Sequence, residues 1–196
     1  LVSYVDITAE KTIVKALSEL LPEAGFITEE NTSSKGMKEY NWVIDPLDGT
    51  TNFIHDLPIF SISIALARNE EILTGVVYEL GRKEIFSAWK NGGAWCNGRL
   101  IRVSKETDLS KSLIATGFPY YDFSYQDQYL ALLKELMRTS HGLRRMGAAA
   151  IDLAYTACGR FEGFFEANLK PWDVAAGKII IEEAGGRVTN FSGGDA

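Results

Sequence analysis

The stretch Trp42–Phe53 reads Trp-Val-Ile-Asp-Pro-Leu-Asp-Gly-Thr-Thr-Asn-Phe. Its first three residues are an apolar run typical of a buried strand, and Asp45 follows at the C-terminal end, where α/β sheets place ligand sites. Pro46 fixes φ and has no amide hydrogen, so we expect a turn that brings Asp48 back toward Asp45. Two carboxylates with a carbonyl between them suit hard cations. A helix that begins near Gly49 would offer free amides to a phosphate.

Other interpretations of this stretch stay open. A haloacid-dehalogenase phosphatase would present Asp-x-Asp with a nucleophilic first carboxylate, whereas here the acids stand at i and i+3 around a proline, which suits metal bridging better. An ordinary strand-to-helix turn would use the same residues without any catalysis, because short motifs match by accident. In that turn Asp48 would cap the helix and Asp45 would be solvated.

Two separated motifs carry a resemblance to a known family. The first continues from Asp45 through Phe53 into Ile-His-Asp-Leu-Pro, and the second is Pro-Trp-Asp-Val-Ala-Ala-Gly at 171–177 followed by Glu-Ala-Gly-Gly at 183–186. In this order they resemble the inositol monophosphatase family of Mg²⁺-dependent, lithium-sensitive phosphomonoesterases. The resemblance implies an α+β or α/β layered sandwich of alternating helix and sheet layers. It also implies further segments beyond both ends, so we expect the chain to be a fragment.

The resemblance assigns a role to each candidate site residue. The predicted ligands of two or three Mg²⁺ ions are Glu29, Asp45, Asp48, Asp173 and the carbonyl of Leu47. The predicted catalytic residues, which position and deprotonate an attacking water, are Glu29, Thr50 and Asp45. The amides of Gly49 and Thr50 are predicted to bind phosphate, and the substrate hydroxyls are predicted to meet Asp48, Ala149 and Glu166. Asp6 is predicted to be a supporting carboxylate near the metal cluster.

Several of these residues have simpler interpretations. Asp6 or Thr8 can cap the helix that follows an extended segment at 1–5. Glu29 can belong to a solvated loop, and Glu166 can be an ordinary acid at the end of a strand. Asp173 can merely favour the dipole of its helix, which is worth about 0.3–1 kcal/mol.

Composition and charge bound the class of protein. The chain has 196 residues, 46% of them hydrophobic, enough for a sizeable core. We expect two tightly packed halves, 1–109 with the first motif and 110–196 with the second. A net charge of −6 argues against a nucleic acid or an anionic membrane as the main partner. No apolar run approaches the roughly 20 residues that a membrane helix needs.

Cys96 and Cys158 lie far apart in the sequence and have no metal-type spacing. Two buried thiols in a reducing cytoplasm are the favoured interpretation, with a bridge left open. The family resemblance implies a homodimer.

Periodicity predicts the remaining elements. A helix with Ile13, Val14, Leu17, Leu20 and Leu21 on its core face is followed by a strand at 25–28 and a polar loop at 31–40. Strands are predicted at 60–66, 72–78, 84–90, 94–96, 99–103, 113–116, 142–145, 161–166 and 187–191. Helices are predicted at 125–138, 147–158 and 172–184.

The resulting hypothesis is Mg²⁺-dependent hydrolysis of a phosphate monoester of a small polyol, with inositol 1-phosphate favoured by the sequence Thr-Asn-Phe-Ile-His at 51–55. Fructose-1,6-bisphosphatase and 3′(2′),5′-bisphosphate nucleotidase activity are alternatives within the same superfamily. An alternative from another class is a cation-binding interaction protein without turnover.

Overall fold

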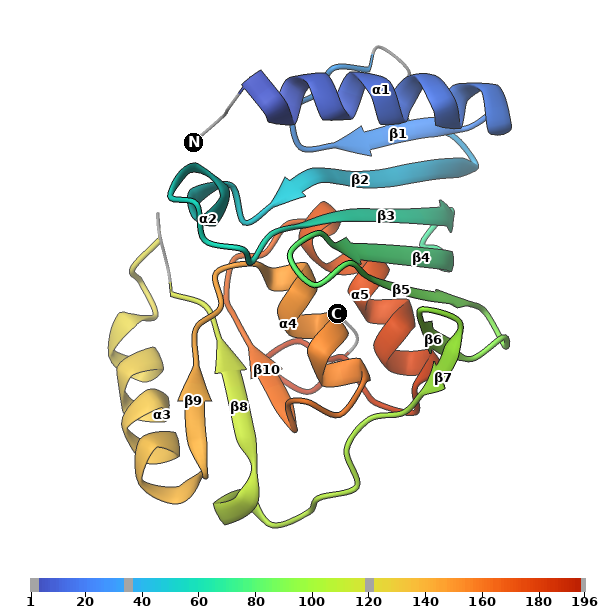
Figure 1. The fold of residues 1–196 in the computed structure, drawn as a ribbon. Helices are drawn as coiled ribbons and strands as arrows, with labels where there is room; N and C mark the ends of the chain where they lie inside the picture. Colours follow the sequence, from blue (N-terminus) through green and yellow to red (C-terminus); the bar gives the residue numbers. More distant parts are fainter. Residues whose placement is uncertain (1–3, 34–36, 119–121, 195–196) are drawn as a thin grey trace.

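The structure, a computed structural model, describes residues 4–33, 37–118 and 122–194. Its main element is a seven-stranded sheet whose strands lie in chain order (Figure 1). Neighbouring strands are antiparallel except for the first pair, which is parallel. The strands are β1 (Gly25–Thr28), β2 (Tyr40–Asp48), β3 (Ser61–Arg68), β4 (Glu71–Glu79), β5 (Glu84–Trp89), β6 (Ala94–Cys96) and β7 (Arg99–Ile101). The predicted run of short strands is thus confirmed.

Helix α1 (Tyr4–Leu20) lies beside β1 and β2 at one edge of the sheet (Figure 1). Its apolar residues pack on a small cluster that includes Phe26, Trp42 and Ile44. Leu20 is 71% exposed, so its predicted place in the core is wrong. The predicted extended segment at 1–5 is wrong for its last two residues, which are helical, and residues 1–3 lie outside the described part. Residues 34–36 of the predicted polar loop also lie outside it.

Helices α4 (Ala149–Ala157) and α5 (Pro171–Glu183) form a second layer against the sheet. Small residues allow them to approach closely. A Cβ on Gly75 of β4 would stand 2.8 Å from the Cα atom of Ala176, and one on Gly177 would stand 2.5 Å from the Cβ atom of Leu153. The close approach buries most of α4, including Ala150 and Ile151. Ala148 and Ala150 lie in the core, in agreement with the packing interpretation of the small residues at 148–150.

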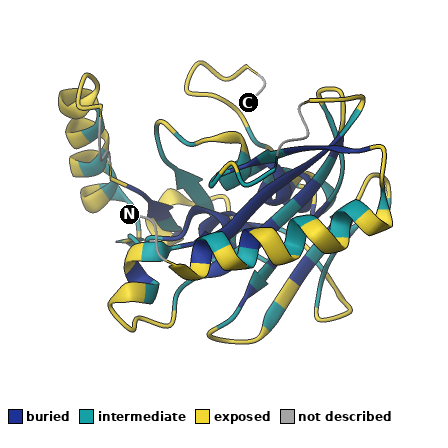
Figure 2. Ribbon diagram, turned by 90° about the horizontal axis from the view of Figure 1, so that it is seen from above, coloured by how far each residue is buried: buried dark blue, intermediate teal, exposed yellow. Residues whose placement is uncertain are grey.

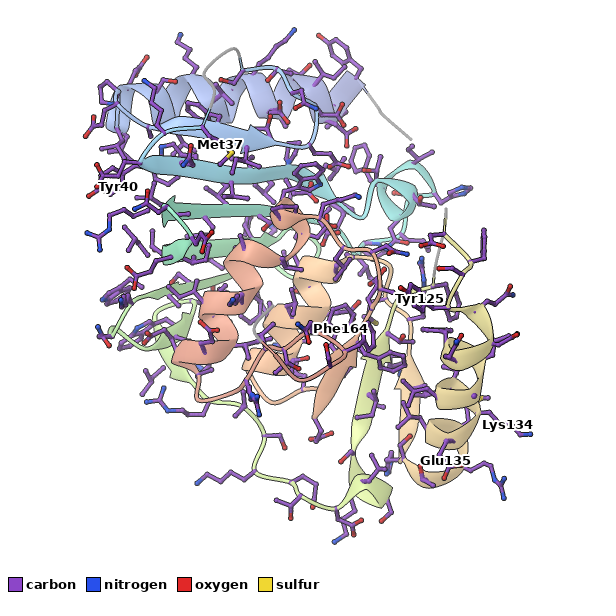
Figure 3. The ribbon with its side chains drawn as sticks, turned by 180° about the vertical axis from the view of Figure 1, so that it is seen from behind. Met37, Tyr40, Tyr125, Lys134, Glu135 and Phe164 are labelled. Atoms are coloured by element: carbon purple, nitrogen blue, oxygen red, sulfur yellow. The ribbon has the colours of Figure 1, made fainter. Side chains whose placement is uncertain are left out.

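A three-stranded parallel sheet completes the fold, in the order β10 (Gly163–Phe165), β8 (Leu113–Thr116) and β9 (Gly142–Arg144). A 3-10 turn, Leu109–Lys111, precedes β8. Helix α3 (Gln126–Thr139) lies against β9 and has no buried residue, and Figure 2 shows it largely exposed. In Figure 3 Lys134 extends from its outer side, whereas Phe164 of β10 packs against the main core.

Three further predictions have an outcome here. The strand predicted at 187–191 is wrong, because only a single bridge residue, Thr189, is found there. Cys96 and Cys158 are free thiols of intermediate exposure, not fully buried. No helix within the described ranges is long and apolar enough to cross a membrane. The division at residue 109 stays a prediction.

The short helix α2 (Thr50–Ile54) follows β2 in the chain, with only Gly49 between them. Its five residues confirm the short helix expected after the first motif.

Candidate active site

Strand β2 carries the first two candidate carboxylates into the interior. Asp45 is 2% exposed and Asp48 is 8% exposed, which rules out the solvated interpretation of Asp45. The pairing with β3 shifts between them, so that Asp45 lies opposite Ser63 and Asp48 opposite Ser61. The strand does not end at Asp45 with a turn at Pro46 as predicted, because β2 continues to Asp48 with a local irregularity, within which the amide of Leu47 donates to Asp45 Oδ1 at 2.9 Å.

Asp48 joins β2 to the beginning of α4. Its Oδ1 accepts the amide of Ala149 at 3.1 Å and its Oδ2 accepts the amide of Ala150 at 2.8 Å. Ser61 Oγ donates to the same Oδ2 at 3.3 Å. Asp48 therefore caps α4 from another part of the chain, and it does not cap α2 as the simpler interpretation expected. A negative charge at this end of α4 also favours the helix dipole.

Gly49 links β2 to α2 with a φ of 90°, a conformation that L side chains rarely adopt. A Cβ there would stand 2.8 Å from the carbonyl oxygen of Ile59. The next residue, Thr50, donates its hydroxyl to Asp6 Oδ1 and to the Leu47 carbonyl, each at 3.0 Å. The turn thus places the Thr50 hydroxyl between a buried carboxylate and one of the predicted metal ligands.

Asp6 does not cap α1, because the helix begins two residues before it. The Asp6 carboxyl is 1% exposed and accepts the Thr50 hydroxyl. The helix-cap interpretation is therefore wrong. The predicted supporting role of Asp6 is compatible with this contact.

Glu29 follows the end of β1 and is half-buried, so it does not belong to a fully solvated loop. Its carboxyl group lies beside that of Asp45. The pKa of Glu29 is raised to about 7, chiefly by burial and also by the charge of Asp173, although the contact with Asp45 lowers it. Asp173, in the first turn of α5, accepts the amide of Lys170 at 2.6 Å, and burial raises its pKa too.

The same carboxylates repel one another across elements. Burial raises the pKa of Asp45 well above its ordinary value, and three neighbouring carboxylates raise it further: Asp48, Glu29 and Asp173. Burial, together with the charge of Asp173, raises the pKa of Asp48 to about 7. Like charges gathered in a buried place oppose ionisation unless a cation joins them. The predicted metal ligands are thus brought within electrostatic reach of one another.

The donor set is compatible with Mg²⁺, although the side chains do not form a complete cage. Among the residues that the structure describes, no three His, Cys, Asp or Glu side chains are placed to hold one ion. Mg²⁺ keeps several waters and takes one or two carboxylates together with substrate phosphates, so it does not require such a cage. Carboxylate and carbonyl oxygens are the ligands that it prefers.

Glu166 directly follows β10, and it lies near enough to Asp48 and Asp173 for their charges to raise its pKa. Burial, followed by the charge of Asp48, raises its pKa to about 7, while Arg145 lowers it. Its carboxyl group packs directly on Gly117, where a Cβ would stand 1.9 Å from the carboxyl carbon. A cavity of about 950 Å³ between α3, β10 and α5 is lined by Glu166, but by none of the other predicted site residues.

Sequence reasoning missed two buried acids next to the site. Glu10 is fully buried in α1 and accepts hydrogen bonds from the loop that carries Glu29. Asp152 is 1% exposed, and neither carboxyl oxygen has a hydrogen-bond partner among the described residues. Burial and the charges of Asp48 and Glu166 raise the pKa of Asp152 to about 9. Both acids lie on apolar helix faces, a signal that the sequence did contain.

Comparisons with known proteins agree with this geometry. The model of the inositol monophosphatase family matches residues 1–196. The chain belongs to this family.

Two relatives and one crystal structure show how similar the chain is to known proteins in sequence and fold. The chain is 44% identical to the Nus factor SuhB of Escherichia coli K12 over 194 residues, which is 98% of this chain and 73% of that protein. It is also 44% identical to the inositol-1-monophosphatase of Rhizobium meliloti, with the same coverage. The crystal structure of the extragenic suppressor protein suhB from Bartonella henselae superposes with a TM-score of 0.93 at 43% identity, covering 99% of this chain and 75% of that one. The family is therefore a phosphatase family whose members include proteins named for other roles.

Proposed function

We propose that this family member hydrolyses the phosphate monoester of a small polyol in the presence of Mg²⁺, with inositol 1-phosphate as the preferred substrate. The observation that supports the proposal is the convergence of Glu29, Asp45, Asp48 and Asp173, in which the charge of Asp173 raises the pKa of the other three. Perturbed carboxyl groups gathered from different elements are a signature of functional sites. The same resemblance that names the substrate also implies lithium sensitivity and a homodimer, and the two free thiols favour a cytoplasmic location.

In this proposal the four carboxylates and the Leu47 carbonyl hold the ions. Bound Mg²⁺ would act as a Lewis acid on the phosphate oxygens and lower the pKa of a water. The Leu47 carbonyl keeps a lone pair for such a role, because it accepts one hydrogen bond from Thr50 and a carbonyl oxygen has two lone pairs.

Glu29 and Thr50 would act on the attacking water. A carboxylate held beside the attacking water can accept its proton, which is the role of a general base. Thr50 donates its hydrogen toward Asp6 and Leu47, so its hydroxyl oxygen can accept a hydrogen bond from that water and orient it. No covalent phosphoenzyme is needed, and the amides of Gly49 and Thr50 would bind the phosphate oxygens.

The polyol would be bound on the side of α4 and β10. Ionised carboxylates only accept hydrogen bonds, which suits hydroxyl groups. Asp48 and Glu166 supply two such acceptors, and Asp48 is tied to the beginning of α4 at Ala149. This arrangement supports a polyol ester over other phosphate monoesters. Fructose-1,6-bisphosphatase and bisphosphate nucleotidase activity would use the same carboxylates.

A second candidate is the interaction protein without turnover. It is favoured by one observation, the name Nus factor SuhB carried by the E. coli relative. The two candidates differ in turnover: both would use the charge of Asp45 to hold a cation, but only the phosphatase would release phosphate.

The test is Asp45→Asn. Asparagine keeps the size of the side chain and the acceptor for the Leu47 amide, so we expect a folded protein without measurable turnover. Phosphate release is followed with inositol 1-phosphate, fructose 1,6-bisphosphate and 3′-phosphoadenosine 5′-phosphate, with Mg²⁺ and with EDTA. The matched control is Asp56→Asn, at an exposed position with a φ of 57° that asparagine tolerates. Undiminished hydrolysis by Asp45→Asn would refute the assignment, and an inactive wild type would favour the second candidate.

A further inference from the structure

Glu10 is an acid in the middle of α1 that is entirely shielded from solvent. A buried carboxylate is costly unless its oxygens are hydrogen-bonded. Here both oxygens have partners, and the donors found among the described residues all belong to the segment 28–32. Glu10 therefore joins α1 to the segment in which Glu29 lies.

The hydrogen bonds of Glu10 are arranged on both sides of Glu29. Its Oε1 accepts the Thr28 hydroxyl at 2.9 Å, the Thr32 amide at 2.8 Å and the Thr32 hydroxyl at 2.7 Å. Its Oε2 accepts the Glu30 amide at 2.8 Å. Two of these donors are backbone amides, so the contact fixes the path of the main chain itself. Glu29 is held from the other side by its own amide, which donates to the Ile44 carbonyl at 3.3 Å.

Asp6 makes a parallel contact one helical turn earlier. Residues four apart lie on the same face of a helix. From this face Asp6 accepts the hydroxyl of Thr50, and Glu10 holds the loop of Glu29. Helix α1 thus contacts the two segments that carry the proposed water-activating residues, and it does so through two buried carboxylates.

We propose that Glu10 is a positioning residue, which holds the 28–32 loop so that the carboxylate of Glu29 is in place beside Asp45. The proposal rests on the function proposed above, because it gives Glu10 its effect through Glu29. A loop left free at this point would let Glu29 move, and a misplacement of about 1 Å can lower a rate by about 10²-fold. Glu10 itself does not touch the substrate.

The test variant is Glu10→Gln. Glutamine can keep its oxygen at the Oε1 position, but its amide nitrogen would then face the Glu30 amide, donor against donor. The matched control is Glu19→Gln, which removes the same charge from an exposed position of the same helix. Four quantities are measured: kcat, KM for inositol 1-phosphate, Mg²⁺ affinity by calorimetry, and hydrogen–deuterium exchange of the peptide that spans 28–33.

We expect Glu10→Gln to lower kcat and to weaken Mg²⁺ binding, each by about tenfold, the range seen when a group that supports a metal ligand is changed. KM should stay within about twofold, because the substrate is bound by other residues. Exchange should accelerate in the 28–33 peptide and not in α1. A loss of folded protein alone would lower kcat but would leave the Mg²⁺ affinity of the folded fraction unchanged. Glu19→Gln should match the wild type in all four measurements.

Unchanged kcat and Mg²⁺ affinity in a folded Glu10→Gln would overturn the proposal, provided that the wild type is active. An inactive wild type would instead overturn the proposed function, while the exchange measurement would still report on the loop. If Glu10→Gln does not fold, Thr32→Val tests the proposal instead. This variant removes only the hydrogen bond from the Thr32 hydroxyl to Glu10. That variant should weaken Mg²⁺ binding by at least about twofold, as expected for one lost hydrogen bond. A Mg²⁺ affinity of Thr32→Val equal to that of the wild type would refute the proposal.

Discussion

Asp48→Asn should make the Mg²⁺-free protein more stable at pH 8 and less stable at pH 4.5, while it removes activity. The reason is that Asp48 has two opposite effects on folding. Its charge is buried beside other carboxylates, which destabilises the folded state at high pH. Its two oxygens also accept the first amides of α4, which stabilises the folded state at any pH.

The size of each effect follows from the structure. The pKa of Asp48 rises from 3.8 to about 7 on folding, so the folded state binds the proton more tightly and stability falls as pH rises through that interval. One pKa unit corresponds to about 1.4 kcal/mol, which makes the ionised side chain cost about 4 kcal/mol above pH 7. Asparagine removes this cost but leaves one α4 amide without an acceptor, a loss of about 1–3 kcal/mol. The net change is a gain of roughly 1–3 kcal/mol at pH 8 and a loss near pH 4.5, where the charge penalty is small.

Urea denaturation in EDTA at both pH values measures this change, with Asp56→Asn as the control that loses an exposed charge. Activity is measured in parallel as phosphate release at pH 8 with Mg²⁺. A free energy of unfolding that changes by the same amount at both pH values would refute the reasoning, because the lost α4 hydrogen bond is independent of pH, whereas the charge of Asp48 and its effect on neighbouring carboxyl groups are not. Retained turnover would refute the role of its charge at the site.

The remaining predictions concern the surroundings of the site. Gly117→Ala would place a Cβ 1.9 Å from the Glu166 carboxyl carbon, so the flexible carboxyl must move; we expect KM for inositol 1-phosphate to rise about tenfold, since a hydrogen bond to a charged group is worth about 1.5–3 kcal/mol. An unchanged KM would argue against Glu166 as a polyol ligand. Arg160→Lys loses the two 2.6 Å hydrogen bonds to Glu84 and should lower the free energy of unfolding by about 1 kcal/mol in urea, with kcat and KM unaltered. A change in kcat there would show that this ion pair reaches the site.

Periodicity alone predicted most of the elements, and it failed where tertiary contacts decide. The alternation at 60–66 predicted a strand with one core face, and β3 is that strand. Its serine and alanine positions, however, are the fully buried ones, with Ser61 at 0% and Ser63 at 1% exposed. The reason is that α5 packs on this face while Ile64 and Leu66 face the cluster under α1. Both faces of the strand are therefore covered, and alternation cannot tell which face is the deeper one.

The site residues were predicted by resemblance, and their partners were not. Nothing local in the sequence shows that Asp48 would cap α4, because its partners lie 101 and 102 residues away. Glu10 and Asp152 carried a usable signal, since each interrupts the apolar face of a helix. A charged residue at a core position of an amphipathic helix indicates either an error in the helix or a buried partner. For Glu10 that partner is the loop of Glu29.

The buried acids themselves argue for a cation-binding site over a purely structural one. Burial raises the pKa of Asp45, Asp48 and Asp152, so each reduces the stability of the Mg²⁺-free fold at neutral pH. Among the described residues the salt bridges involve other acids, such as Glu71, Glu84 and Asp108. A chain that only presented a surface to a partner would gain nothing from this arrangement, because apolar side chains of similar size would fold more stably. A cation that binds the folded state alone would reverse the penalty by mass action. The proposed Mg²⁺ site thus gives a physical reason for the burial of these destabilising acids. The acids in turn supply the negative charge that such a site needs.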